Sequence, residues 1–488
     1  MNEICNGLKL LFARKIPDVL LFNSGTFWTL FILFITVYSL IYRRKTQMML
    51  YVATFSLGFY FLTNGFYFLI LPFTALCDFF LAKKIYNTDN QRKKTFFLSI
   101  SIVLSLGILF YFKYTNFFIK SWNEIFSGNF NPVDIFLPVG ISFYTFQTIS
   151  YVTDVYKQRV KPADSFLQYL FYLSFFPLIL AGPIMRAKNF FPQIKNNKTI
   201  SRSMIYGGLW LIILGLIKKA IFADYIAQYN NWVFDAPLTY SGFECLVAVL
   251  GYTAQIYCDF SGYSDMSIGM AAVMGFDLGK NFNLPYQAQN LSDFWRRWHI
   301  SLSTWFRDYV YIPLGGNRKG TCRTYLNNLI TMLIAGLWHG ASYMFIIWGG
   351  MHGVGLIVHK MQKKWLDRIP DRWYFNIFWR LLTFSFVAFL WIFFRAANLT
   401  VCKDMISNTI CHFDFAYFMP FLQVRPTYCV FLLLIFLLHS VKQPFWDRMQ
   451  AIFIRSSIIV KILLFTIVIQ LIIQFGSDEV QPFIYFQF

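Results

Sequence analysis

Apolar runs of about twenty residues recur along the whole chain, and short segments rich in Lys and Arg separate them. A helix needs about 20 apolar residues to cross the ~30 Å hydrocarbon core of a bilayer. The pattern therefore predicts an all-α polytopic membrane protein, because helices satisfy their own backbone hydrogen bonds in lipid. We expect about ten crossings. The clearest runs are residues 26–42, 96–112, 377–394 and 458–475.

Some apolar stretches are unsuited to a simple crossing. Residues 166–183 end in Gly182-Pro183 and have basic residues on both sides, so we expect a re-entrant element that enters the membrane and returns. Residues 267–276 are too short to cross and should lie in the interface. Residues 328–338 and 341–358 should form a hairpin whose tip carries His339 and Gly340.

The densest polar segment is SDFWRRWHISLSTWFRDYVYIPLGG, residues 292–316. At 100° per residue it predicts one helix with an aromatic face and a basic face, started by Ser292 or Asp293 and ended by Pro313. The aromatic face comprises Trp295, Trp298, His299, Leu302, Trp305 and Phe306, and the basic face comprises Arg296, Arg297, Ser303, Thr304, Arg307 and Asp308. Two interpretations stay open: an interfacial helix with its arginines on lipid headgroups, or the wall of a functional site.

Composition supports the membrane class. Of the 488 residues, 57% are hydrophobic and only 14% are charged, which is more apolar surface than one soluble core could hide. The 43 Lys and Arg exceed the 23 Asp and Glu, giving a net charge of +20. These basic residues cluster between apolar runs, as in cytoplasmic loops that face anionic lipid, so nucleic-acid binding is not indicated. Counting by charge places both termini outside the cytoplasm.

Neither repeats nor a separate soluble region interrupt this pattern, so we expect a single integral-membrane domain over residues 1–488. The eight cysteines form no CxxC pair, and we recognise no ligand set for a metal ion.

Chemistry is most strongly indicated at His339. Ionisable side chains at membrane depth are costly, and those that persist are commonly functional. A neutral imidazole costs less than a charged group and can act as a base near pH 7. The flanking Gly336 and Gly340 would let another backbone or a substrate approach closely. His299 is a second histidine of this kind, and together they make a functional site more probable than packing alone.

Several motifs together are highly specific. DFWRRWHISLSTWFRDYVYIPLGG (293–316) and LIAGLWHGASYMFIIWGGMHG (333–353) resemble the membrane-bound O-acyltransferase (MBOAT) family, in the branch that contains alginate O-acetyltransferases and D-alanyl-transfer proteins (AlgI and DltB). PVGISFYTFQTISYVTDVYK (138–157), FFPLILAGPIMR (175–186) and YCDFSGYSDMSIGMA (257–271) match the same branch.

The resemblance implies a ring of ten or more transmembrane helices around a thin centre with a tunnel, and interfacial and re-entrant helices beside it. It also implies a bacterial inner-membrane enzyme with no bound cofactor. An acyl thioester, acetyl-coenzyme A or an acyl carrier protein, would enter from the cytoplasm. The acceptor would be an extra-cytoplasmic surface polysaccharide or a secreted SGNH-type transferase partner.

The family's catalytic histidine corresponds to His339 in LWHG, and its second histidine corresponds to His299 in RRWH. His339 would take the proton of the acceptor hydroxyl, and His299 would orient the donor or stabilise the oxyanion. The expected donor contacts, with lipid headgroups as the competing interpretation of the arginines, are Arg296, Arg297, Arg307, Trp298, Trp305 and Trp338.

Residues 476–488 follow the last apolar run and contain PFIYFQF. The motif resembles the FIYxxF-type C-terminal sequence of DltX, the small partner protein in D-alanylation. By that resemblance, Tyr485 would enter the tunnel from the extra-cytoplasmic side and carry the acyl group as an ester. A simple anchor at the membrane surface is the alternative.

Two other classes of function remain open. A flippase or transporter of an envelope precursor would also show broken helices and a polar site at membrane depth, although we find no inverted repeat. An MBOAT enzyme could instead transfer D-alanyl groups, or acylate a lipid or a protein. The branch-specific motifs favour acetylation of a surface polysaccharide.

Overall fold

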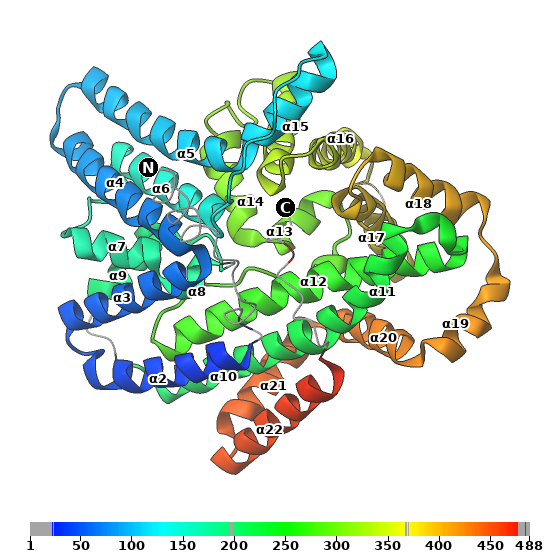
Figure 1. The fold of residues 1–488 in the computed structure, drawn as a ribbon. Coiled ribbons are helices and arrows are strands. Elements are labelled where there is room, and N and C mark those ends of the chain that lie inside the picture. Colours follow the sequence, from blue (N-terminus) through cyan, green and yellow to red (C-terminus); the bar gives the residue numbers. More distant parts are fainter. Residues whose placement is uncertain are drawn as a thin grey trace, which may run out of the picture. The chain divides into compact units, whose positions relative to one another are not determined.

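A computed structural model describes residues 22, 24–180, 182–195, 199–366, 368, 370–476 and 484, and every element in this part of the chain is a helix (Figure 1). The chain forms two compact units. Unit 1 comprises Met1–Leu209 and Ser267–Gly279, and unit 2 comprises Trp210–Met266 and Lys280–Phe488.

Unit 1 is built around a cluster of aromatic side chains. Phe34 packs against Phe176, and Phe175 packs against Phe276, with ring centroids 5.1 Å apart in both pairs. The unit also holds the first part of α10 (Arg202–Leu216). Its other helices are α2 (Gly25–Ile41), α3 (Lys45–Asn64), η2 (Gly65–Leu69), α4 (Ile70–Asn87), α5 (Gln91–Phe126), α6 (Ile141–Tyr156), α7 (Phe166–Ser174), α8 (Phe176–Ile179) and α9 (Ala187–Lys195).

Unit 2 contains both histidines singled out in the sequence. Its helices are the remainder of α10, η3 (Ile217–Ala223), α11 (Asp224–Asp235), η4 (Pro237–Thr239), most of α12 (Gly242–Val273), η5 (Pro285–Gln287), α13 (Leu291–Arg297), α14 (Ile300–Phe306), η6 (Arg307–Tyr311), α15 (Thr321–His339), α16 (Tyr343–Leu366), α17 (Trp373–Arg395), α18 (Leu399–Cys411), η7 (Phe415–Tyr417), α19 (Phe418–Val424), α20 (Pro426–Ser440), α21 (Gln443–Arg455) and α22 (Ile458–Phe475).

Five helices of the described chain are long and apolar enough to cross a membrane, or up to six if the bent pair formed by 415–424 and 426–440 is one span. The five are Lys45–Asn87, Gln91–Phe126, Arg202–Asp235, Trp373–Arg395 and Ile458–Phe475. This number is lower than the ten crossings expected. One reason is that α12 and α16 carry buried polar side chains, among them Asp259 and His352, which lower their apolar character.

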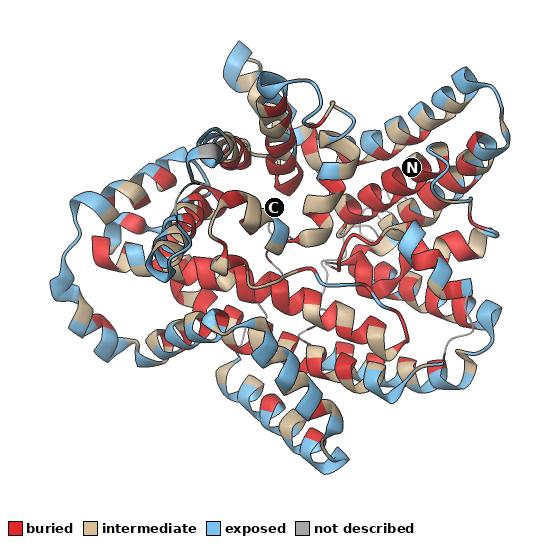
Figure 2. Cartoon of the chain, turned by 180° about the vertical axis from the view of Figure 1, so that it is seen from behind, coloured by how far each residue is buried: buried red, intermediate tan, exposed pale blue. Residues whose placement is uncertain are grey.

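The apolar side chains of α22 lie mostly on the surface, as Figure 2 shows for the C-terminal helices, whereas α12 is mostly buried. An exposed row of Ile, Leu and Val is typical of a helix that faces lipid. Its one lysine, Lys461, turns inward and donates to the carbonyl oxygens of Ile454 and Ser456 at the end of α21, 3.3 and 2.5 Å away. The charge therefore caps a helix C-terminus instead of facing hydrocarbon.

One sequence expectation for the middle of the chain is wrong. Residues 267–276 do not form a separate interfacial element, because α12 continues without a break through Val273. The acidic stretch around Asp259 and Asp265 lies inside that helix, where Lys219 and Lys218 pair with the two carboxylates. Residues 166–183 are interrupted, since α7 ends at Ser174 and the four-residue α8 follows; the re-entrant path expected for this segment stays a prediction.

Glycines set the distances between the helices that carry the site. A Cβ on Gly336 of α15 would collide with the carbonyl oxygen of Phe345, and one on Gly349 of α16 would collide with that of Met332. The hairpin of α15 and α16 is therefore packed backbone to backbone (Figure 1). The approach at Gly336 is made by the chain itself, which is one of the two possibilities that the sequence left open.

Candidate active site

The basic segment does not form one helix. α13 ends at Arg297, Trp298 is extended, and α14 begins at Ile300. His299 between them has φ 41° and ψ 57°, the left-handed conformation that costs a residue with a Cβ roughly 1 kcal/mol or more. The cap of α13 is also different from the one expected, because the side chain of Asn290, not Ser292 or Asp293, accepts from the backbone at the helix start. The predicted continuous helix over residues 292–316 is therefore wrong.

Asn281 holds His299 in this conformation. Its Oδ1 accepts hydrogen bonds from the backbone N–H and the hydroxyl of Ser301, at 3.2 and 2.9 Å, and lies 3.2 Å from Nδ1 of His299. Its Nδ2 donates to Ser264 Oγ at 3.0 Å, and its backbone carbonyl accepts from the N–H of Ile300 at 2.9 Å. Since a backbone N–H points at Oδ1, that atom must be the acceptor.

The same bond fixes the tautomer of His299. An acceptor at Oδ1 of Asn281 requires the proton on Nδ1, which leaves the lone pair on Nε2. The side chain is fully buried against Phe260, with ring centroids 4.5 Å apart, and burial lowers the pKa of His299 to about 3. His299 lies between α13 and α14, and neither helix is among the candidate membrane-spanning helices of the described residues. At neutral pH His299 is therefore an uncharged imidazole that accepts at Nε2.

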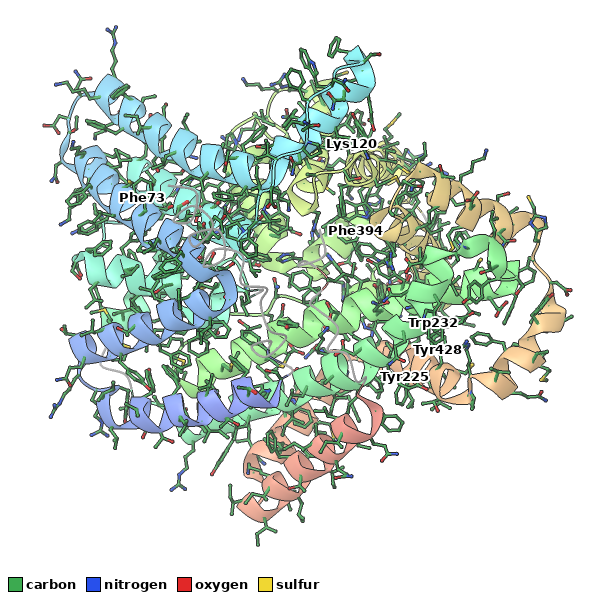
Figure 3. The ribbon with its side chains drawn as sticks, in the orientation of Figure 1. Phe73, Lys120, Tyr225, Trp232, Phe394 and Tyr428 are labelled. Carbon is green, nitrogen blue, oxygen red and sulfur yellow. The ribbon has the colours of Figure 1, made fainter. Side chains whose placement is uncertain are left out.

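His339 is the last residue of α15, and its side chain is 3% exposed. Aromatic rings surround it: those of Trp338, Trp348 and Phe394 lie with centroids 5.0, 5.0 and 5.2 Å from its own. Phe394, labelled in Figure 3, comes from α17. The residue thus lies inside the protein and not on a lipid-facing surface, as a catalytic base must.

Trp338 connects the two histidines. Its ring centroid lies 5.0 Å from that of His339 and 6.3 Å from that of His299. The sequence placed these residues forty positions apart, on two separate elements, and the structure brings them around one indole. Trp338 is itself 3% exposed, so it forms part of the wall of this site and not an external docking surface.

The other expected donor contacts are divided among different roles. Trp298 is buried and packs on Trp391 and Phe294, and Trp305 is also buried. Arg297 donates to Asp293 at 2.9 Å, one turn earlier in α13, and therefore stabilises that short helix. Arg307 pairs with Asp308, 2.8 Å away, and borders a cavity of about 210 Å³ near Lys360.

Arg296 borders a much larger cavity, of about 1210 Å³, between α13, α16 and α17. Leu382 and Phe386 of α17 form part of an apolar wall, and Lys360 and Lys363 of α16 lie among the polar residues that line it. Burial lowers the pKa of Lys360. α16 lines this cavity with Ile347 and Met351, while Trp348 between them contacts His339. A cavity with both cations and apolar walls fits an amphiphile with an anionic group.

The sequence singled out the C-terminal motif, but not its contact with Asp259 of α12. The backbone N–H of Ile484 donates to Asp259 Oδ2 at 3.0 Å, and its side chain is 3% exposed. Asp259 precedes Phe260, whose ring packs on His299. Residue 484 is therefore held inside unit 2 instead of at a membrane surface. The neighbouring Tyr485 lies outside the described residues.

Asn281 and Ser264 were likewise missed. Ser264 lies in the DFSGYSD stretch, which served only for the family resemblance, and Asn281 lies in a segment with no periodicity. An asparagine 18 residues before a histidine carries no signal by itself. Within the described residues, no group of three or more His, Cys, Asp or Glu side chains is arranged to hold a metal ion.

A polytopic helical protein with two buried histidines around one tryptophan matches one family closely. The family model described as "MBOAT, membrane-bound O-acyltransferase family" matches residues 161–402. Together with the relatives below, this match confirms the resemblance. The chain belongs to the membrane-bound O-acyltransferase family and is a multi-pass membrane O-acyltransferase, which sets aside the interpretation as a transporter.

Curated relatives are similar over most of their length. The chain is 37% identical over 396 residues to a peptidoglycan O-acetyltransferase of Helicobacter pylori, covering 74% of this chain and 75% of the relative. It is 38% identical over 392 residues to a probable alginate O-acetylase AlgI of Pseudomonas putida, covering 79% of each. A teichoic acid D-alanyltransferase of Bacillus subtilis is 28% identical over 270 residues, covering 53% of this chain and 68% of that protein.

Proposed function

We propose that this enzyme moves an acetyl group from a cytoplasmic thioester across the membrane to a hydroxyl of an extra-cytoplasmic cell-envelope polysaccharide, directly or through a secreted transferase. Support comes from the relatives named as O-acetylating enzymes of peptidoglycan and alginate, which are more similar to this chain than the D-alanyltransferase. The observation that carries it is the pair of buried histidines around Trp338.

The membrane arrangement follows from the same reasoning. The enzyme lies in the bacterial inner membrane with both termini outside the cytoplasm, and its helices surround a thin centre crossed by a tunnel. The exposed aliphatic surface of α22 supports a lipid-facing position for the last helix.

His339 is the general base in this scheme. It takes the proton from an attacking hydroxyl as the oxygen bonds to the thioester carbonyl, the C–S bond breaks, and the thiolate leaves. The imidazolium then returns the proton to the thiolate, so that a free thiol and an ester are the products. Its enclosure by three aromatic rings supports this role, because the rings exclude bulk water from the reacting atoms.

His299 is better suited to accept a hydrogen bond than to stabilise an oxyanion. With its proton held on Nδ1 by Asn281, Nε2 can only receive a hydrogen, and an oxyanion needs a donor. We therefore assign His299 to orienting the nucleophilic hydroxyl. This differs from both roles expected from the sequence, which were orientation of the acyl donor and stabilisation of the oxyanion.

The thioester donor, which is a substrate and not a bound cofactor, would occupy the large cavity at Arg296. Coenzyme A and the phosphopantetheine arm of an acyl carrier protein both combine an anionic phosphate with an uncharged arm. Arg296, Lys360 and Lys363 supply the cations, and the walls from α17 supply the apolar contact. Anionic membrane lipid is the competing ligand for these cations.

Tyr485 is the proposed carrier of the acyl group. Its phenol would receive the acetyl group as an aryl ester, which remains reactive enough to pass the group to an acceptor hydroxyl outside. Splitting the transfer into two steps means that the donor need not cross the membrane. The position of Ile484, one residue earlier, supports this assignment. Its N–H binds Asp259, and the next residue, Phe260, packs on His299.

Radiolabelled acetyl-coenzyme A, supplied to the purified enzyme in proteoliposomes with an oligosaccharide acceptor, tests the scheme. We expect His339→Ala to slow transfer by about 10²–10⁴-fold without loss of folding. His412→Ala, at the exposed end of α18, is the control and should leave the rate unchanged. Normal transfer by folded His339→Ala would refute the assignment.

The intermediate is tested separately in the same assay. Label should appear on the C-terminal peptide of the wild-type enzyme and not on that of Tyr485→Phe. If Tyr485→Phe keeps full transfer activity, the acyl-tyrosine step is wrong, while the role of His339 stands.

A further inference from the structure

A buried ionic cluster lies beside the candidate active site in unit 2. Lys219 is 1% exposed, and its Nζ lies 2.7 Å from Asp224 Oδ1 and 2.5 Å from Asp259 Oδ1. Asp224 is 6% exposed and Asp259 is 3% exposed. One ammonium therefore faces two buried carboxylates.

The local backbone is shaped to bring these groups together. Residues Ile217–Ala223 form a π-helix between α10 and α11, and such insertions occur frequently at functional sites. Just before it, a Cβ on Gly215 would lie 2.6 Å from the carbonyl oxygen of Gly262, so that α10 and α12 pack with their backbones in contact. Lys218 and Lys219 then reach different carboxylates of α12, at Asp265 and Asp259.

Asp259 of this cluster also accepts a hydrogen bond from the backbone. Backbone N–H groups stabilise a buried carboxylate through their partial positive charge. The donor found is the N–H of Ile484, which bonds Asp259 through Oδ2, the oxygen not used by Lys219. The contact is made by the backbone N–H, so it fixes the position of the chain at residue 484 and does not depend on which side chain that residue carries.

We propose that Lys219, Asp224 and Asp259 form a receptor for the protein's own C-terminal segment, in which Asp259 binds the backbone at Ile484 and thereby positions residue 485. This inference rests on the proposed function for the role of Tyr485. Asp259 and the two partners that hold it are positioning residues, since none of them is required to touch the acyl group. The DFSGYSD stretch thus has two roles. Asp259 binds the C-terminal segment at Ile484, and Ser264 accepts a hydrogen bond from Asn281.

Amide hydrogen exchange of the full-length enzyme in detergent, read by mass spectrometry on C-terminal peptides, measures this bond directly. We expect slow exchange at Ile484 in the wild type and about 10–100-fold faster exchange in Asp259→Ala, as the loss of a charge-assisted hydrogen bond implies. Asp259→Asn keeps the shape of the side chain and should give an intermediate value. Exchange in α15 and α16 reports whether each variant is folded.

Asp265→Asn is the matched control. Asp265 lies on the same helix and pairs with the neighbouring lysine at 2.6 Å, but no contact with residue 484 involves it. In Asp265→Asn, the amide of Ile484 should exchange as slowly as in the wild type. Equal exchange in wild type, Asp259→Ala and Asp265→Asn would overturn the receptor, as would equal acceleration in all the carboxylate variants.

The outcome is independent of the acyl-tyrosine proposal. Tyr485→Phe should keep the slow exchange at Ile484, because the receptor binds the backbone one residue earlier. If the tail is released in Asp259→Ala while Tyr485→Phe transfers acetyl normally, the receptor stands and the shuttle fails. If the tail exchanges rapidly even in the wild type, the receptor fails and the general base at His339 is untouched.

Discussion

Replacing Asn281 by Leu removes the group that sets both the conformation and the tautomer of His299. Four side-chain hydrogen bonds are lost, three at Oδ1 and one at Nδ2. At about 1 kcal/mol each, their loss lowers the free energy of unfolding by up to ~4 kcal/mol. The side-chain contact that orients the imidazole of His299 is then lost, and the ring can rotate or change tautomer.

Activity should fall as well as stability. A displacement of about 1 Å at a reacting group can cost ~100-fold in rate, and we expect a loss of that order in kcat for Asn281→Leu. Asn327→Leu is the control: Asn327 is also fully buried, but it bonds the carbonyl of Gly316, 2.9 Å away. It should lower the melting temperature with little change in kcat.

Asn281→Asp separates positioning from simple packing. The carboxylate can accept the same hydrogen bonds, but its negative charge favours the imidazolium and raises the pKa of His299 from about 3. Transfer should then be restored in part, with its acid limb shifted to higher pH. The reasoning is refuted if folded Asn281→Leu transfers acetyl at the wild-type rate, or if the pH profile of Asn281→Asp is unshifted.

Three further results are expected. The pKa of buried His299 is about 3 and that of an exposed histidine is about 6.5, so the unfolded chain binds more protons between these pH values. The contribution of His299 to the free energy of unfolding is therefore fully present above pH 6.5 and falls by up to ~1.4 kcal/mol per pH unit as the pH drops towards 3. Thermal melts in detergent can follow this loss. Gly336→Ala should lower the melting temperature because its Cβ meets the Phe345 carbonyl, whereas Gly350→Ala, with only a side-chain atom at 3.4 Å, should not. Arg296→Glu should raise the KM for acetyl-coenzyme A with little effect on kcat, and an unchanged KM would instead favour a lipid role.

The last helix shows what the apolar pattern predicts well. Residues 458–475 form α22 as expected, and the hairpin tip at His339 also lies where the sequence placed it. In both places local signals agree: a long apolar run between polar ends, and a glycine beside a change of direction. The glycine-flanked hairpin tip is also what singled out His339 as a candidate site residue.

The break at His299 could not be predicted in the same way. Residues 292–306 contain neither Gly nor Pro, and their periodicity fits one helix, so the local preference opposes the structure. Contacts from Asn281 and Ser301 override it. The continuity of α12 was missed for a related reason, since the carboxylates of Asp259 and Asp265 are neutralised by lysines from a different helix. Periodicity describes one segment and carries no information about its partners.

Ile484 belongs to the same polypeptide as Asp259, which binds it, and this has a kinetic consequence. Ile484 is eight positions beyond Gly476, which follows α22, and a fully extended chain of eight residues reaches at most about 29 Å. A group tethered by so short a linker has an effective concentration on the order of millimolar. In the proposed scheme, a carrier tyrosine on the same chain stays available however dilute the enzyme becomes, whereas a carrier on a separate polypeptide would have to be reached by diffusion in the bilayer.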